Sequence, residues 1–357
     1  MMGFEIRQSL AKLQPYHVED AVWKIKLDAN ENNNPLPPAV VEQISQALGN
    51  SCLQRYPSSD EELRSLIAAN YTTAKISAEN VALGCGSSEI LLALCQAFGG
   101  PGKKIVFPSP SFSMYGIYAQ ITDSIAVPVT LNADFSLPVD QFIAAAQSAS
   151  LVLVCNPNNP TGNVMEPSTV EKILAAVHCP VILDEAYMEF YGQSAVDLLA
   201  VYPQLIVART FSKAYGLAAA RVGYMLASTQ LIEVANKVLL PYHVNALSLK
   251  VAEVVCRNRT LFDEVIAATI RERDDFSARL AKIGGITVYP SQANFIMIQL
   301  TQAVQLERYL AAAGIAIRSF ASAPGLTGCL RITVGTAAEN ATVLEEIKAF
   351  CQSEAMK

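Results

Sequence analysis

Three short segments of the chain carry side chains that together could perform chemistry on an amine. They are Asn156-Pro157-Asn158-Asn159-Pro160-Thr161-Gly162, then Asp184-Glu185-Ala186-Tyr187, then Arg209-Thr210-Phe211-Ser212-Lys213 with Arg221-Val222-Gly223 just beyond it. Each segment alone has an ordinary interpretation as a polar turn, a surface charge or a solvated loop. Together they offer an amide, a carboxylate with a phenol, and a set of hydroxyl, lysine and arginine groups, which favours one common site.

These residue types suit an aldehyde cofactor that carries a phosphate. A lysine amine forms a Schiff base with an aldehyde, and a carboxylate that faces a pyridine nitrogen keeps it protonated, so that the ring becomes an electron sink. An amide and a phenol can donate hydrogen bonds to a ring oxygen. Hydroxyls, an arginine and the N–H groups at a helix N-terminus can hold a phosphate, and Gly84-Cys85-Gly86-Ser87-Ser88 stands before an apolar helix as such a site requires.

Each of the three segments follows a short apolar run that we expect to form a buried strand. Runs rich in Val and Ile and bounded by polar residues or Pro are typical of such strands, and they occur at 104–107, 125–129, 151–155, 181–183 and 205–208. Helical patterns alternate with them at 40–48, 60–70 and 89–98, and we expect Ser87 and Ser88 to cap the last. The alternation predicts an α/β fold with a mainly parallel sheet between helices, whose ligands bind at the carboxyl ends of the strands.

The remainder of the chain predicts a smaller α+β domain and an N-terminal arm. We expect a short helix at 4–13, a long helix over 251–283, strands at 287–289, 295–299, 315–319 and 330–334, and a last helix over 338–352. The Asn- and Pro-rich segment 28–38 favours extended backbone. We therefore expect an arm and part of the small domain over 1–40, a large domain over 41–245 and a small C-terminal domain over 246–357.

Composition narrows the classes of protein to consider. The chain has 357 residues, of which 52% are hydrophobic, but no run of about 18 apolar residues occurs, so we expect no membrane span. A net charge of −6 without a basic block argues against nucleic-acid binding. Eight scattered cysteines and three histidines without ligand spacing indicate reduced thiols in a cytoplasm and no metal site.

The chain resembles the fold-type I aminotransferases that use pyridoxal 5′-phosphate (PLP), within the aspartate aminotransferase superfamily. Among these it is most similar to the histidinol-phosphate aminotransferases of histidine biosynthesis. The resemblance covers nearly the whole chain, through Leu13-Gln14-Pro15-Tyr16, Leu27-Asp28-Ala29-Asn30-Glu31-Asn32, Gln54-Arg55-Tyr56-Pro57 and 329–336. It implies a large domain with a mainly parallel seven-stranded sheet, a smaller α+β domain, and ping-pong transamination between histidinol phosphate and 2-oxoglutarate or glutamate.

The resemblance also implies a role for each matching residue. Lys213 would be the Schiff-base lysine and proton carrier, Asp184 the partner of the ring nitrogen, and Tyr187 a donor to the ring's 3-oxygen. The remaining cofactor contacts would be Ser87, Ser88, Phe112, Asn159, Thr210, Ser212 and Arg221. Tyr56 would reach the cofactor phosphate of the neighbouring subunit in a homodimer. The substrates would be held by Tyr16, Asn30, Arg318 and Arg331. The two arginines suit this role because a planar guanidinium group can bind either a carboxylate or a phosphate.

Other functions on the same fold stay open at this point. An aromatic amino acid aminotransferase of the same subgroup can share nearly all of these residues. A PLP decarboxylase for a phosphorylated amino acid such as threonine phosphate is less favoured, because that group usually has a His-Gly-Gly-type start where this chain has Leu27 to Asn32. A PLP-binding regulator would carry an added DNA-binding domain, for which we expect no room in 357 residues.

Overall fold

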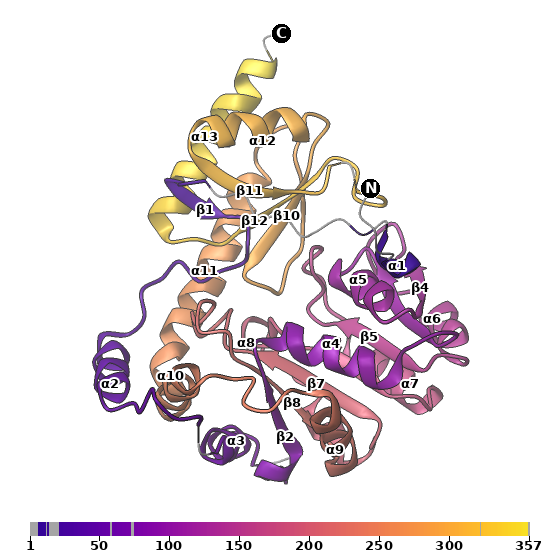
Figure 1. Ribbon diagram of the computed structural model, residues 1–357. Coiled ribbons are helices and arrows are strands. Elements are labelled where there is room, and N and C mark those ends of the chain that lie inside the picture. The colour runs from indigo at the N-terminus through magenta and orange to yellow at the C-terminus, as the bar shows by residue number, and fades with distance from the viewer. Residues whose placement is uncertain are drawn as a thin grey trace.

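Two β-sheets organise the molecule (Figure 1). The computed structural model describes residues 6–11, 13, 21–57, 59–72, 75–321 and 323–355. The larger sheet has seven strands in the order β2-β8-β7-β6-β5-β3-β4, and the smaller has five in the order β1-β11-β12-β10-β9. The predicted α/β class with a seven-stranded, mainly parallel sheet is confirmed.

The larger sheet brings the ends of its central strands to one edge. Its strands are β2 (Val81–Gly84), β3 (Lys104–Ser109), β4 (Ile125–Thr130), β5 (Leu151–Cys155), β6 (Val181–Asp184), β7 (Leu205–Thr210) and β8 (Gly223–Ala227). Strands β4, β3, β5, β6 and β7 run parallel to one another, whereas β8 is antiparallel to both β7 and β2. Every residue of β5, β6 and β7 is buried, as expected for strands covered on both faces.

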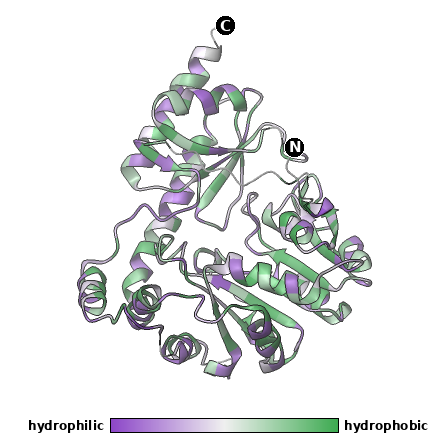
Figure 2. Ribbon diagram, in the orientation of Figure 1, coloured by the Kyte–Doolittle hydropathy of each residue, from purple (hydrophilic) through white to green (hydrophobic). Residues whose placement is uncertain are grey.

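Helices surround this sheet (Figure 1). They are α2 (Pro38–Gly49), α3 (Glu61–Ala68), α4 (Ser87–Phe98), α5 (Met114–Ile121), α6 (Val139–Ala146), α7 (Pro167–Ala176), α8 (Met188–Tyr191) and α9 (Thr229–Val238), with short 3₁₀ turns at η1 (Ala78–Asn80) and η2 (Val196–Ala200). Helix α4 packs against α5 and α9 and contacts β7 and β8, whereas α6 packs against α7, β3 and β4. The strands between them are mostly apolar (Figure 2).

The smaller sheet combines the N-terminal arm with the C-terminal third of the chain. It contains β1 (Ile25–Leu27), β9 (Thr287–Tyr289), β10 (Phe295–Gln299), β11 (Ile315–Ser319) and β12 (Cys329–Thr333), and is accompanied by α11 (Asp263–Leu280), α12 (Ala303–Ala312) and α13 (Ala337–Ala355). Strand β1 pairs in parallel with β11, so the arm forms one edge of this sheet. Leu27 of the arm belongs to the same apolar core as Ile296, Leu330 and Val343.

The expected long helix over 251–283 is wrong. Helix α10 (Ala246–Arg257) ends at Asn258, a 3₁₀ turn η3 (Arg259–Phe262) follows, and α11 then begins at Asp263. Helix α10 packs against α2 and α3, whereas α11 packs against α13. Because α10 and α11 pack against different helices, they cannot form one straight helix. The charges keep a helical spacing across the turn at 259–262, so the sequence pattern does not reveal it.

Further corrections concern where elements begin. Helix α4 starts at Ser87 with Gly86 as its N-cap, so the two serines lie in the first turn and do not cap the helix as expected. Strands β1, β2 and β8 were not predicted. Of the helix expected at 4–13, the structure has α1 (Gln8–Ala11), while residues 4, 5 and 12 lie outside the described residues.

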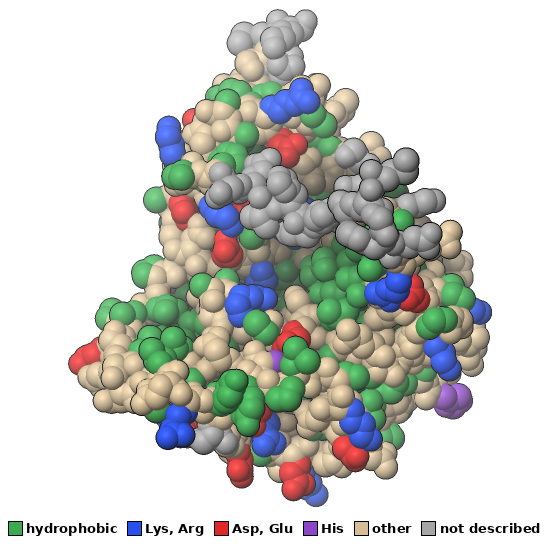
Figure 3. Space-filling model, in the orientation of Figure 1, with side chains coloured by type: hydrophobic (Ala, Val, Ile, Leu, Met, Phe, Trp, Pro, Cys, Tyr) green, Lys and Arg blue, Asp and Glu red, His purple; other side chains and the backbone are tan. Residues whose placement is uncertain are grey.

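The surface carries both signs of charge. On the face shown in Figure 3, acidic and basic side chains are interspersed and do not gather by sign. Within the ranges that the structure describes, no helix has the length and apolar character needed to cross a membrane.

Candidate active site

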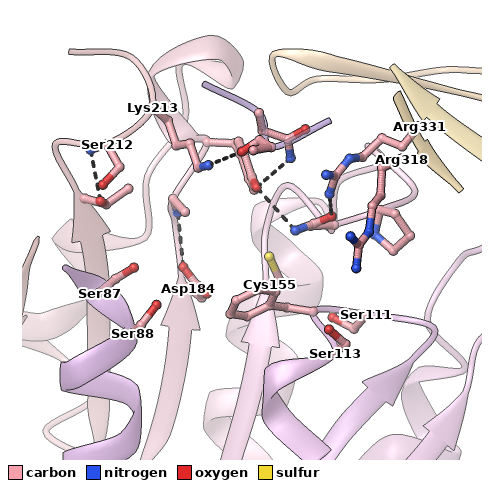
Figure 4. A pocket seen from close by; sticks show the side chains of 18 of the residues that line it. Ser87, Ser88, Ser111, Ser113, Cys155, Asp184, Ser212, Lys213, Arg318 and Arg331 are labelled. Carbon is pink, nitrogen blue, oxygen red and sulfur yellow. Dashed lines mark hydrogen bonds between the residues drawn. The ribbon is translucent and has the colours of Figure 1, made fainter. Parts of the chain in front are cut away.

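The strand ends of the larger sheet and the N-terminus of α4 open into one cavity of about 270 Å³. Its lining includes most of the residues predicted from the sequence, namely Asn30, Ser87, Ser88, Phe112, Asn159, Asp184, Tyr187, Thr210, Ser212, Lys213, Arg221, Arg318 and Arg331. Ser87 and Ser88 lie on one side, Arg318 and Arg331 on the other, and Lys213 and Asp184 between them (Figure 4). Tyr56 lies on the surface with 76% of its area exposed, and Tyr16 lies outside the described residues.

The Ser87 side of the cavity depends on two glycines that allow close packing. Gly86 has a φ of +76°, and a Cβ there would lie 2.4 Å from Nη2 of Arg221. A Cβ on Gly223 would lie 2.2 Å from the backbone nitrogen of Ser87. Arg221 can therefore lie directly against the start of α4, where first-turn N–H groups lack helical partners and the helix dipole favours an anion.

Hydroxyl groups complete this side. Nη1 of Arg221 donates to Oγ of Ser212 over 3.3 Å, and the backbone N–H of Ser212 donates to Oγ1 of Thr210 over 3.0 Å. Thr210 ends β7 and Ser212 follows it, so the sheet itself fixes both groups. A guanidinium, several hydroxyls and a helix N-terminus together make a site suited to a phosphate.

Asp184 is a buried carboxylate at the end of β6, with only 3% of its area exposed. Burial raises its pKa to about 6. Two hydrogen bonds act in the opposite direction: the Tyr115 hydroxyl donates to Oδ2 over 3.0 Å, and the Ala186 N–H donates to Oδ1 over 3.3 Å. The positive charge of Lys213 also lowers the pKa. The carboxylate is therefore mostly ionised at neutral pH and is held in a fixed orientation.

Tyr187 places a phenol beside this carboxylate. Its oxygen accepts hydrogen bonds from Nδ2 of Asn30 over 2.9 Å and from Nδ2 of Asn159 over 3.3 Å. Burial raises the pKa of Tyr187 above its usual range, so the phenol keeps its proton. That proton is available to a third group.

Lys213 lies between the two sides, after β7. Its Nζ donates to the backbone oxygen of Ala29 over 2.8 Å and lies 6.0 Å from the centre of the Tyr187 ring. Removal from water and the positive charges of Arg331 and Arg221 together lower the pKa of Lys213 to about 7, while Glu31 opposes them. A substantial fraction of the amine is therefore neutral near pH 7, as a nucleophile or base requires.

Two arginines form the opposite side. Arg331 of β12 donates to Oδ1 of Asn159 over 2.6 Å and to the backbone oxygen of Asp28 over 2.5 Å. Arg318 of β11 is its direct partner across the antiparallel pair. Like charges directly opposite on two strands repel each other, so an anion bound between these arginines would stabilise the arrangement.

Sequence reasoning missed several residues that line or support the cavity. Tyr115 holds Asp184 and packs edge-on against Phe112 with ring centres 5.6 Å apart; its signal was a position one helical turn after Phe112. Cys155 ends β5 at the same edge of the sheet as Asp184, so the strand-end rule could have found it. Burial raises the pKa of the Cys155 thiol, which fits a packing role. The backbone carbonyls of Asp28 and Ala29 carry no signal in residue type.

Across the described ranges, no group of three or more His, Cys, Asp and Glu side chains is placed to hold a metal ion.

The model of the family described as aminotransferase class I and II matches residues 23–347, and the chain belongs to that family. The histidinol-phosphate aminotransferase of Thermoanaerobacter pseudethanolicus is 36% identical over 345 residues, which are 96% of this chain and 97% of that protein. These matches confirm the family that the sequence resemblance implied.

Solved structures share the fold. The histidinol-phosphate aminotransferase from Sinorhizobium meliloti in complex with pyridoxal-5′-phosphate superposes with a TM-score of 0.87 at 24% identity, over 99% of each chain. The L-threonine-O-3-phosphate decarboxylase from Porphyromonas gingivalis gives a TM-score of 0.80 at 22% identity, over 92% of this chain and 99% of that one. At these identities the likeness concerns the fold, which two reaction classes share, so the choice of reaction depends on the site.

Proposed function

We propose that this chain catalyses PLP-dependent transamination between histidinol phosphate and 2-oxoglutarate, with glutamate as the other product, in a ping-pong sequence. The observation that carries the proposal is a cavity with an anion site on each side and Lys213 and Asp184 between them. One anion site suits the phosphate of a cofactor, and the other suits the carboxylate or phosphate of a substrate. The name of the T. pseudethanolicus relative supports histidinol phosphate as one of the substrates.

The residues present fit PLP. The two glycines that bring Arg221 against α4 form a cradle that any side chain would fill, and the donors around it suit a phosphate. The groups that would hold PLP are Ser87, Ser88, Thr210, Ser212 and Arg221 at the phosphate, Phe112 against the ring, Asp184 at the ring nitrogen, and Tyr187 and Asn159 at the 3-oxygen. When bound, PLP supplies an electron sink that acidifies the Cα–H of an amine substrate.

The chain's own residues then move the proton and hold the charges. Asp184, ionised at neutral pH and fixed by Tyr115, keeps a positive charge on the ring nitrogen. Lys213 would hold the cofactor, and its free Nζ would accept the proton from the substrate Cα and pass it to the cofactor. A lysine pKa of about 7 matches a group that must both take up and release a proton near neutral pH.

Arg331 and Arg318 address the recognition of two unlike substrates. Glutamate carries two carboxylates, whereas histidinol phosphate carries a phosphate ester and no carboxylate. A guanidinium group can bind either anion through two parallel hydrogen bonds. Their adjacent positions on β11 and β12 let one site serve both substrates in turn.

We also propose a homodimer in which Tyr56 reaches the partner's cofactor phosphate. Tyr56 stacks on Tyr242 with ring centres 4.5 Å apart, and both are exposed, as are Leu53 and Leu240. A cluster of exposed apolar side chains favours a protein interface. Leu240→Asp is expected to yield monomers in sedimentation and to weaken PLP retention; a dimer that persists with normal retention would contradict this arrangement.

A half-reaction screen tests the proposed reaction. The PLP-loaded protein is mixed separately with histidinol phosphate, glutamate, phenylalanine, tyrosine and threonine phosphate, and absorbance follows conversion of the bound cofactor to its amine form. We expect rapid conversion by histidinol phosphate and glutamate, and none in Lys213→Ala. Conversion by phenylalanine without histidinol phosphate would instead establish an aromatic aminotransferase, and CO₂ release from threonine phosphate a decarboxylase.

A further inference from the structure

We infer that Asn30 is a positioning residue that acts through Tyr187: it holds the phenol oxygen so that the phenol hydrogen points into the cavity. The inference rests on the proposed function, because a ring oxygen of PLP is what that hydrogen would meet. It differs from the substrate contact that the sequence resemblance implied for Asn30.

Asn30 has its polar groups engaged by the protein. It is 1% exposed. Its backbone N–H donates to Oγ1 of Thr333 over 3.0 Å, its Oδ1 accepts from the same hydroxyl over 3.3 Å, and its backbone oxygen accepts from Nδ2 of Asn294 over 3.1 Å. Its Nδ2 donates to the Tyr187 oxygen over 2.9 Å. A side chain so engaged is suited to support another residue.

The backbone at Asn30 is held in a conformation that few residues adopt. Its φ is +54°, in the left-handed region, where Asn is among the better tolerated residues after Gly. Thr333 and Asn294 belong to the small sheet and its β10 loop, so they fix the arm against that sheet. The amide of Asn30 is thereby aimed at Tyr187, which follows β6 of the large sheet.

The two amide groups that donate to the Tyr187 oxygen restrict where the hydroxyl hydrogen of Tyr187 can point. The oxygen accepts from both Asn30 and Asn159, and neither amide nitrogen can accept a hydrogen in return. The hydrogen therefore points into the cavity that Tyr187 lines. An oxygen that accepts two hydrogen bonds also becomes a stronger donor through its own hydrogen.

The two amides differ in their second partner. Asn159 accepts from Arg331, so it connects Tyr187 to the substrate side. Asn30 accepts from Thr333 and connects Tyr187 to the small sheet. Asn30 therefore fixes the position of the phenol, whereas Asn159 is bonded to Arg331, which we propose binds the substrate.

The test follows the absorbance of PLP bound to Lys213 as the pH is varied, in the full-length holoenzyme. Asn30→Asp keeps the shape and tolerates the positive φ but replaces the amide donor by an acceptor. Asn30→Gly suits that φ and removes the donor without adding charge. The matched controls are Asn33→Asp and Asn33→Gly, since Asn33 is on the same arm and its amide donates to the Lys26 backbone oxygen and to Glu339.

We expect both Asn30 variants to raise the pH midpoint of the absorbance change by about one unit, which corresponds to one ordinary hydrogen bond. Weaker donation to the ring oxygen leaves more electron density there, so the neighbouring Lys213 nitrogen holds its proton more tightly. Arg331, Cys155, Asp184 and Lys213 also face Tyr187, and all are unchanged in these variants. The Asn33 controls should keep the wild-type midpoint.

A double-mutant cycle decides whether Asn30 acts through Tyr187. In a Tyr187→Phe background, Asn30→Gly should add no further shift, because it removes the donor without adding charge. Additive shifts, a shift with Asp but not with Gly, or unshifted midpoints in both variants would overturn the inference. A wild-type protein without a Lys213-dependent absorbance band would instead overturn the proposed function, so the two failures are distinguishable.

Discussion

The two sides of the cavity are built in different ways. The side around Ser87 and Arg221 comes from neighbouring strands of one sheet, where β2, β8 and β7 lie next to each other. The side around Arg331 comes from the arm, from the small sheet and from Asn159 of the large one. A binding site within one sheet is fixed by local packing, whereas one shared by several segments can vary with each of them. We expect the first side to hold what the family shares and the second to set the substrate.

Arg221→Gln should have the largest effect, because it should weaken PLP binding on one side of the cavity and leave substrate binding on the other side unchanged. Loss of a charged hydrogen-bond donor to a phosphate is expected to weaken PLP binding by about 10- to 100-fold. The KM for histidinol phosphate, measured at saturating PLP, should stay near the wild-type value. Titration of the apoprotein with PLP measures the first quantity, and Arg271→Gln, on the exposed surface of α11, is the control. A raised KM with normal PLP affinity would break the division between the two sides.

Arg331→Lys should weaken the binding of substrate and leave the binding of PLP unchanged, which is the reverse of the effect of Arg221→Gln. It keeps the charge but loses the planar group that binds an anion at two points, so KM should rise by roughly 10-fold for both substrates. PLP affinity should not change. Steady-state kinetics with each substrate varied in turn measures these KM values. The same measurement on Arg318→Lys tells which arginine contributes more to the binding of histidinol phosphate. Equal KM values in Arg331→Lys and wild type would refute the anion site on this side.

Tyr115→Phe examines the support beneath Asp184. Its hydrogen bond lowers the pKa of Asp184, so its removal should raise that pKa and reduce the ionised fraction near neutrality. We expect kcat to fall about 2-fold at pH 6.5 and to recover at pH 8, because the loss of about 1 kcal/mol raises the pKa of Asp184 by less than one pH unit. Tyr71→Phe, which removes a buried 2.8 Å hydrogen bond to Tyr224 away from the cavity, should lower stability and leave the pH profile of kcat unchanged. Identical pH profiles for Tyr115→Phe and wild type would count against the proposed support.

A further expected effect concerns the stability of the apoprotein. The folded-state pKa of Asp184 is about 6, above the unfolded value of about 3.9. Between these values the folded protein retains a proton that the unfolded chain has lost, so the contribution of Asp184 to stability falls as pH rises through this window. Asp184→Asn should therefore gain on wild type by roughly 2 kcal/mol between pH 4 and pH 7, measured by urea unfolding. A pH-independent difference would show that Asp184 has an ordinary pKa.

The side of the cavity built by the large sheet could be predicted from the sequence more fully than the side built by the arm and the small sheet. Asn159, Asp184 and Lys213 each follow a short apolar strand, and neighbouring parallel strands bring their ends to one edge, so local patterns were enough to place them together. The seven-stranded sheet was implied by the family resemblance, because local patterns predicted β3, β4, β5, β6 and β7 but not β2 and β8.

The arm depends on contacts that no local pattern carries. Strand β1 has three residues, and its register with β11 pairs Ile25 with Ile315. The partners of Asn30 include Tyr187 and Thr333, which lie 157 and 303 residues further along the chain. Residue types can suggest that such a segment approaches the site, but only the packing of the two sheets decides which atoms it meets.

Identification of the lysine that carries PLP tests the central claim most directly. Reduction of the holoenzyme with borohydride makes the bond between lysine and cofactor permanent, and trypsin does not cleave at a lysine so modified. The account predicts PLP on the peptide from Thr210 to Arg221, with the modification at Lys213, and none in Lys213→Ala. Attachment to any other lysine, or none in the wild-type protein, would contradict it.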